Sequence, residues 1–220
     1  MIELAAFDVA GTTVQEYGAV YVALREAVEA AGATPGTGDI DRSMGADKRE
    51  AIHALLGGPS PETVEDVFAD FHRRLTSAYA ARKPEPLPGV EKAFAVLRAA
   101  GVKVALTTGF DRSITEALLG LLGWDSAVVD AVVCADDVAA GRPAPYMVFR
   151  AMELTRVHAA SSVLTAGDTV LDLRAGTNAG AGFVVGVLTG SMNAAQLGGE
   201  RHTHLLPGVA DVPALLGLGG

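Results

Sequence analysis

The sequence predicts an α/β fold, a doubly wound parallel sheet with a helical domain inserted after its first strand. Short apolar runs alternate with helical patterns over most of the 220 residues. Consecutive residues in these runs are apolar, as expected for strands that helices cover on both faces of a parallel sheet. One segment near the N-terminus carries helical patterns alone, so it is predicted to be an insertion.

The predicted strands follow one another with a helical pattern between most pairs. They are residues 2–9, 102–108, 127–137, 161–168 and 182–190. The helical pattern before the second strand, VEKAFAVLRAAG, ends at Gly101, a residue typical of helix C-termini. In a doubly wound sheet the ligand crevice lies at the edge where the strands end. We therefore expect the functional residues directly after these runs.

The insertion spans residues 18 to about 82, where no strand is predicted. Its helical patterns are residues 17–32, 46–57 and 62–83. The last pattern begins with acids and ends with Arg82 and Lys83, which suits the helix dipole. The proline-rich KPEPLPGV then indicates a rigid connector back to the sheet. The expected division is an α/β core of residues 1–14 and 85–220 and a helical cap of residues 15–84.

Composition and charge exclude several classes of function. The net charge of −9 would repel a polyanion, so nucleic acid is not an expected partner, although local cations could bind a small anion. The single cysteine, Cys134, allows no intrachain disulfide. No signal-like or membrane-spanning apolar stretch is visible, so we expect a soluble cytoplasmic protein without membrane contact. The apolar cap residues AVYVAL (19–24) could serve a homodimer.

Reactive side chains follow four of the predicted strands. They are Asp8, then Thr107 with Thr108 and Gly109, then Arg142, then Asp168 with Asp172 one helical turn later. A carboxylate can be a nucleophile toward phosphorus, and two carboxylates can share Mg²⁺. Hydroxyl, backbone N–H and guanidinium groups can bind the remaining phosphate oxygens. The strand ends therefore predict a magnesium-dependent phosphoryl-transfer site.

The segments DVAGTT, LTTGF, AGRPAP and GDTVLD resemble, in this order, the four motifs of the haloacid dehalogenase superfamily of aspartyl-phosphate hydrolases. The resemblance covers nearly the whole chain, including a helical cap after the first strand. It implies that Asp8 is the nucleophile, Thr108 (or Thr107) binds phosphate, Arg142 is the basic residue and Asp168 binds Mg²⁺ with support from Asp172. The residues expected to contact the substrate are Gly11, Thr12, Met44, Thr107 and Gly109.

Ala10 stands where most phosphatases of this superfamily carry a second aspartate, which protonates the leaving group and later activates water. General acid–base help of this kind contributes roughly 10²–10⁴-fold. Alanine cannot supply it, although its backbone carbonyl can still bind a metal. Cleavage of a C–P bond fits this absence, because the leaving carbanion needs an electron sink, such as an iminium formed by a lysine and an aldehyde.

The cap segment SMGADKREAIHALLG provides Lys48. It resembles the cap of the phosphonatase-like (phosphonoacetaldehyde hydrolase-like) branch of the superfamily, which has Ala two residues after the nucleophile. There a Met-Gly-x-x-Lys stretch supplies a Schiff-base lysine, and Met44, Gly45 and Lys48 match it. Two positions depart from this branch: Ala51 replaces a histidine, and Phe110 stands where tyrosine is frequent.

Three functions therefore remain open from the sequence. The leading hypothesis is hydrolysis of a small phosphonate, such as phosphonoacetaldehyde, through an aspartyl phosphate and a Lys48 Schiff base. The alternative is a magnesium-dependent phosphomonoesterase whose acid–base group lies elsewhere than position 10. The third is a catalytically weak relative that binds or regulates.

Overall fold

The computed structural model describes residues 1–218, without the side chain of Thr37. A six-stranded sheet lies at its centre, in the order β5-β4-β1-β6-β7-β8, and all neighbouring strands are parallel. Its strands are β1 (Leu4–Asp8), β4 (Lys103–Thr107), β5 (Ala131–Val133), β6 (Val163–Gly167), β7 (Phe183–Val187) and β8 (His204–Leu206). The predicted α/β fold is confirmed.

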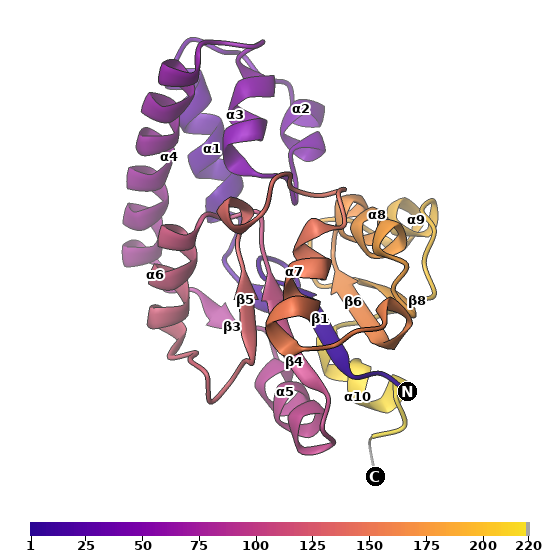
Figure 1. Cartoon of the computed structure of the whole chain (residues 1–220). Helices are drawn as coiled ribbons and strands as arrows, with labels where there is room; N and C mark the ends of the chain where they lie inside the picture. The colour runs from indigo at the N-terminus through magenta and orange to yellow at the C-terminus, as the bar shows by residue number, and fades with distance from the viewer. Residues whose placement is uncertain (219–220) are drawn as a thin grey trace.

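Ten α-helices surround the sheet or lie above it in the described chain (Figure 1). They are α1 (Ala19–Ala30), α2 (Thr37–Arg42), α3 (Lys48–Leu55), α4 (Pro61–Ala81), α5 (Val90–Ala99), α6 (Arg112–Leu122), α7 (Tyr146–Thr155), α8 (Val170–Ala179), α9 (Ala194–Gly198) and α10 (Val212–Leu215). Short 3₁₀ turns cover Ala135–Asp137, Ala160–Ser162 and Val209–Asp211.

Strand β1 shows why the sheet is covered on both faces. Its side chains alternate: Ala5 and Phe7 belong to the core that contains α5 and α6, whereas Leu4 and Ala6 pack with residues of α7. All four are at most 2% exposed. The Phe7 ring lies 5.3 Å from that of Phe94 in α5, centroid to centroid. An unbroken apolar run therefore forms a strand in the middle of the sheet.

Helices α1 to α4 form a layer above the edge of the sheet (Figure 1). Helices α1 and α3 both pack against α4, the longest helix described. Helix α4 begins where Ser60 accepts a hydrogen bond from the Thr63 N–H and Pro61 occupies the first turn. The Ser60 cap and Pro61 therefore determine where this helix starts.

Two short strands join this layer to the sheet. β2 (Val14–Gln15) pairs antiparallel with β3 (Glu85–Pro86). The sequence did not predict these strands, although the expected boundary at 14/15 falls inside β2 and the one at 84/85 lies directly before β3. The division into core and cap at those residues stays a prediction.

One predicted strand of the sheet is shorter in the structure, and one strand of the sheet was not predicted. The run 127–137 contains a strand only at Ala131–Val133, because Asp125 folds the preceding residues into a turn by accepting from the Ala127 N–H. Beyond the strand, Asp137 accepts from the Cys134 N–H and ends it in a 3₁₀ turn. Strand β8 was missed, since its three half-buried residues carry no apolar run.

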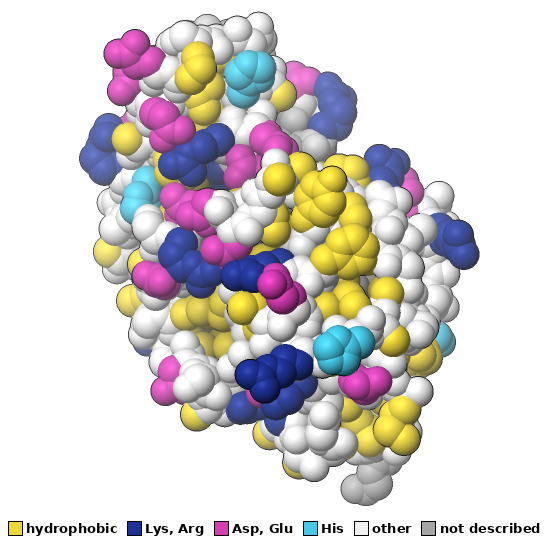
Figure 2. All heavy atoms as spheres, in the orientation of Figure 1, with side chains coloured by type: hydrophobic (Ala, Val, Ile, Leu, Met, Phe, Trp, Pro, Cys, Tyr) yellow, Lys and Arg dark blue, Asp and Glu magenta, His cyan; other side chains and the backbone are white. Residues whose placement is uncertain are grey.

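Figure 2 shows acidic and basic side chains interspersed over the visible face, with hydrophobic side chains gathered near α7. Among residues 1–218, no helix is both long enough and apolar enough to cross a membrane. Within the expected dimer stretch, Val20 and Leu24 are buried in the monomer, whereas Val22 is 56% exposed. Val22 is therefore the side chain that a second copy could contact, and the homodimer stays a prediction.

Candidate active site

A small pocket lies where the strands of the sheet end, between the sheet and the helices above it. The sheet side contributes Asp8, Ala10, Thr108 and Arg142, among others, and the helices contribute Tyr21 and Lys48. A larger cleft, of about 750 Å³, lies among α1, α2 and α3. None of the reactive residues at the strand ends lines that cleft, so the smaller pocket is the candidate site.

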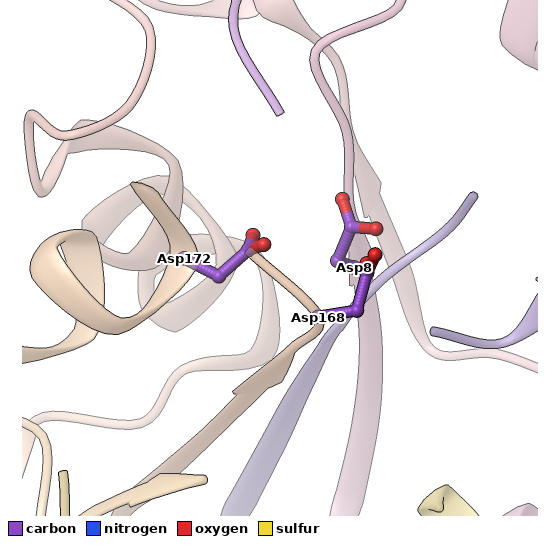
Figure 3. A group of neighbouring side chains, drawn as sticks. All are labelled: Asp8, Asp168 and Asp172. Atoms are coloured by element: carbon purple, nitrogen blue, oxygen red, sulfur yellow. The ribbon is translucent and has the colours of Figure 1, made fainter. Parts of the chain in front are cut away.

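Three buried carboxylates meet at the sheet edge (Figure 3). Asp8 ends β1, Asp168 follows β6, and Asp172 reaches back from α8. One oxygen from each lies within 4.8 Å of the others. The topology explains this meeting, because β1 and β6 are parallel neighbours and both end at the same edge.

The backbone around Asp168 leaves room only for glycine. A Cβ on Gly190 would lie 1.8 Å from the Asp168 Oδ2 atom, and one on Gly11 would lie 2.7 Å from it. Gly11 also has a positive φ of 86°. The Thr12 hydroxyl donates to Asp168 Oδ1 at 2.8 Å. Gly11 and Thr12, expected to contact substrate, therefore shape and orient Asp168.

Arg142 is the cation of the cluster. Its Nη1 lies 2.6 Å from Asp8 Oδ1 and its Nε lies 3.0 Å from Asp172 Oδ1. Its Nη2 donates to the carbonyl and the hydroxyl of Thr107, both at 2.8 Å. The guanidinium is thus fixed from three sides beside the Asp8 carboxylate.

The cluster holds more negative charge than Arg142 neutralises. Burial raises the pKa of Asp8 to about 6, although the Arg142 guanidinium acts in the opposite direction. Burial, followed by the charges of Asp8 and Asp172, raises the pKa of Asp168 well above its ordinary value. A bound divalent cation would relieve this repulsion.

The donor set fits a hard cation such as Mg²⁺, which prefers oxygen ligands. Asp8 and Asp168 are the carboxylates best placed to hold it, and Ala10, which lines the same pocket, could add its carbonyl. Asp172 fits less well as a ligand. Its Oδ2 already accepts from the N–H of Thr169 at 3.0 Å and from the Thr169 hydroxyl at 2.5 Å, while Oδ1 pairs with Arg142.

Lys48 brings an amine from the helical layer into the pocket. It is the first residue of α3, which Asp47 caps by accepting from the Glu50 N–H. Its side chain is buried, and Nζ donates to the Ala46 carbonyl at 2.7 Å. Burial lowers its pKa to about 8, so roughly a tenth of the amine is neutral at pH 7.

The segment before Lys48 touches the strand ends very closely. A Cβ on Gly109 would lie 2.5 Å from the Ala46 carbonyl oxygen, and one on Gly45 would lie 2.6 Å from the Thr169 hydroxyl. Glycine is thus required on both sides of this contact. Gly109, expected to bind substrate, lines the pocket and permits the approach.

The remaining predicted residues divide between the pocket and its surroundings. Thr108 lines the pocket, whereas Thr107 faces Arg142, which favours Thr108 over Thr107 as the phosphate contact. Met44 lies at the margin, with its sulfur 2.9 Å from the Ser191 hydroxyl. Tyr21 and Gly190 were missed. Nothing in the helical pattern of α1 marks Tyr21, and Gly190 stands out only once Asp168 is placed.

Comparisons with known proteins identify the family. Residues 2–180 match the haloacid dehalogenase-like hydrolase family. A phosphonoacetaldehyde hydrolase of Bacteroides fragilis is 33% identical over 221 residues, which cover 94% of this chain and 82% of that protein.

Solved structures share the fold. A phosphonoacetaldehyde hydrolase-like protein from Oleispira antarctica superposes with a TM-score of 0.85 at 22% identity, covering 98% of this chain and 91% of that one. A β-phosphoglucomutase from Clostridium difficile gives 0.84 at 18% identity, covering 99% and 97%. The family match and the 33% relative show that the chain belongs to the haloacid dehalogenase-like hydrolases.

Proposed function

We propose that the protein hydrolyses a small phosphonate bearing an aldehyde, such as phosphonoacetaldehyde, at its C–P bond. The observation that carries the proposal is the pairing of two side chains in one pocket: the buried amine of Lys48 and the carboxylate of Asp8. The relatives that are 32–33% identical carry the name phosphonoacetaldehyde hydrolase, which supports the same substrate class.

Lys48 begins the reaction in this proposal. Its neutral amine attacks the aldehyde carbon, and loss of water leaves an iminium. With the pKa at about 8, roughly a tenth of the amine is neutral at pH 7. The contact between Nζ and the Ala46 carbonyl orients the amine before substrate arrives.

Asp8 then attacks phosphorus. The C–P bond breaks, and its electron pair moves into the iminium to give an enamine, so no acid at position 10 is needed. Arg142 and Thr108 bind phosphate oxygens, and Mg²⁺ held by Asp8 and Asp168 would neutralise charge on the phosphate. Water hydrolyses the aspartyl phosphate, and protonation and hydrolysis of the enamine release acetaldehyde and restore Lys48.

Borohydride trapping tests the Lys48 step. Reduction in the presence of phosphonoacetaldehyde should attach a stable adduct to Lys48, detected by mass spectrometry of peptides. The initial trapping rate should rise as pH passes about 8, because the neutral amine becomes the main form. Lys48→Arg should give no adduct, while the exposed Lys83→Arg should behave as wild type. Absence of an adduct in the wild-type protein would remove the Schiff base from the proposal.

A phosphomonoesterase is the second candidate, favoured by Ala51. This residue lies one helical turn after Lys48 and offers no proton-transfer group beside the amine. Ala10→Asp separates the two functions. For a C–P hydrolase we expect phosphate-ester turnover to rise by roughly 10²-fold while phosphonate turnover falls. The second candidate would be favoured if the wild type already hydrolyses phosphate esters fast and if Ala10→Asp leaves the phosphonate rate unchanged.

A further inference from the structure

Tyr21 lines the pocket beside Lys48, and none of the steps above uses it. It lies in the first turn of α1, which Figure 1 shows next to the sheet. The Glu16 carboxylate fixes this turn by accepting from the N–H groups of Gly18 at 3.0 Å and Val20 at 2.8 Å. The Tyr21 ring packs against the hydrophobic core. Its position in the pocket is therefore built into the start of the helix.

The hydroxyl of Tyr21 is available to a ligand. Among the described residues it has no hydrogen-bond partner, although the side chain is partly buried. Burial, with the nearby Asp168, Asp8 and Glu16 carboxylates, raises the pKa of this phenol well above its usual value. The group keeps its proton and can act as a neutral hydrogen-bond donor.

In the proposed function, the other polar side chains of the pocket serve the phosphate group or the Schiff base. Arg142 is held by Asp8 and Asp172, and the Thr108 hydroxyl accepts from the Phe110 N–H at 3.1 Å. Lys48 donates to Ala46. Ala10, which also lines the pocket, provides no side-chain donor. On the helical side of the pocket, Tyr21 is thus the donor left for the part of the substrate that leaves phosphorus.

We propose that Tyr21 is a specificity-determining residue whose hydroxyl donates a hydrogen bond to an oxygen of the group bonded to phosphorus. The protein would then prefer substrates with a carbonyl or hydroxyl oxygen on that group over those with a purely hydrocarbon one. The inference rests on the proposed function, because it takes the space between Asp8 and Lys48 as the place of the leaving group.

Tyr21→Phe tests this role because it keeps the ring and removes only the hydroxyl. Tyr79→Phe is the matched control. The Tyr79 hydroxyl is buried in α4 of the same helical layer without a partner, and it does not line the pocket. The measurements are kcat/KM for phosphate release from phosphonoacetaldehyde and from glycolaldehyde phosphate, and the inhibition constant of inorganic phosphate. Ethyl phosphate is the reference ester, since its leaving group carries no further oxygen.

For Tyr21→Phe we expect kcat/KM to fall about tenfold or more on the oxygen-bearing substrate that the wild type hydrolyses. The inhibition constant of phosphate and the rate with ethyl phosphate should stay within about twofold. Tyr79→Phe should match the wild type throughout.

Equal losses on ethyl phosphate and on the oxygen-bearing substrate, or no loss at all, would overturn the assignment of Tyr21. Hydrolysis of glycolaldehyde phosphate but not phosphonoacetaldehyde by the wild type would overturn C–P cleavage alone, and the Tyr21 comparison would then be decided on the ester. A wild type that hydrolyses neither compound would overturn both.

Discussion

The two walls of the pocket are built in opposite ways. On the sheet side, the carboxylates and Arg142 form a dense network in which each charge has a charged or hydrogen-bonding partner. On the helical side, Lys48 has one backbone carbonyl and Tyr21 has no partner among residues 1–218. In the proposed function the rigid sheet side would bind the phosphate group, and the groups of the helical side would bind the rest of the substrate.

Asp8→Asn gives the largest effect and tests the sheet side alone. The variant keeps the shape of the side chain but cannot form an aspartyl phosphate. We expect phosphate release to fall by at least ~10³-fold for every substrate, while circular dichroism stays unchanged. The exposed Asp66→Asn should keep wild-type rates. An Asp8→Asn variant with a tenth of the activity or more would mean that another group is the nucleophile.

Lys48→Met tests whether the pKa of Lys48 on the helical side is lowered. The unfolded chain keeps the Lys48 proton to about pH 10.5, whereas the folded protein releases it near pH 8. The unfolded state binds more protons between these values, so the free energy of unfolding rises with pH there.

The gain from Lys48 should reach about 3 kcal/mol between pH 8 and 10.5, and methionine should abolish it. Urea denaturation of both proteins across this range measures the difference, in which the contributions of other groups cancel. Stability curves that run parallel for wild type and variant would show that the amine titrates normally.

Gly109→Ala tests the contact between the two walls and has the smallest expected effect. The new Cβ would lie 2.5 Å from the Ala46 carbonyl oxygen, so the segment carrying Lys48 must move away. We expect kcat/KM to fall about tenfold, because displacement of a reacting group by even 1 Å is costly.

Gly120→Ala is the matched control for Gly109→Ala. Apart from its chain neighbours and the backbone of its own helix, no atom lies within 4 Å of the position its Cβ would take in α6, so it should stabilise the helix slightly and leave the rate unchanged. Wild-type kinetics of Gly109→Ala would show that the closeness of the two walls does not matter for turnover.

The residues of the sheet side could be predicted from the sequence more fully than those of the helical side. Asp8, Thr108 and Asp168 each follow an apolar run, and parallel strands end at a common edge, so their meeting could be predicted. Arg142 sits in a loop, and the resemblance of its segment to a known motif indicated it. The contacts that place Asp172 on Arg142 could not be predicted, because they depend on how α8 starts after β6.

The helical wall was predicted only in part. Lys48 follows Gly45 in a recognisable segment, but its burial depends on the glycines at positions 45 and 109, which are far apart in sequence. Tyr21 belongs to an amphipathic helix whose pattern does not distinguish a residue facing the pocket from one facing the core. Long-range packing, rather than local propensity, decides both positions.

Strand β1 is made long before the two strands that pair with it. β4 and β6 follow it by roughly 100 and 160 residues. Helices α1, α3 and α4 contact one another within about 60 residues and are complete before β4 is made. Local contacts form first, so on the ribosome the helical layer can assemble while β1 still lacks both neighbours. Asp8 is made before the helical layer, yet its surroundings are completed only after Asp168 has left the exit tunnel.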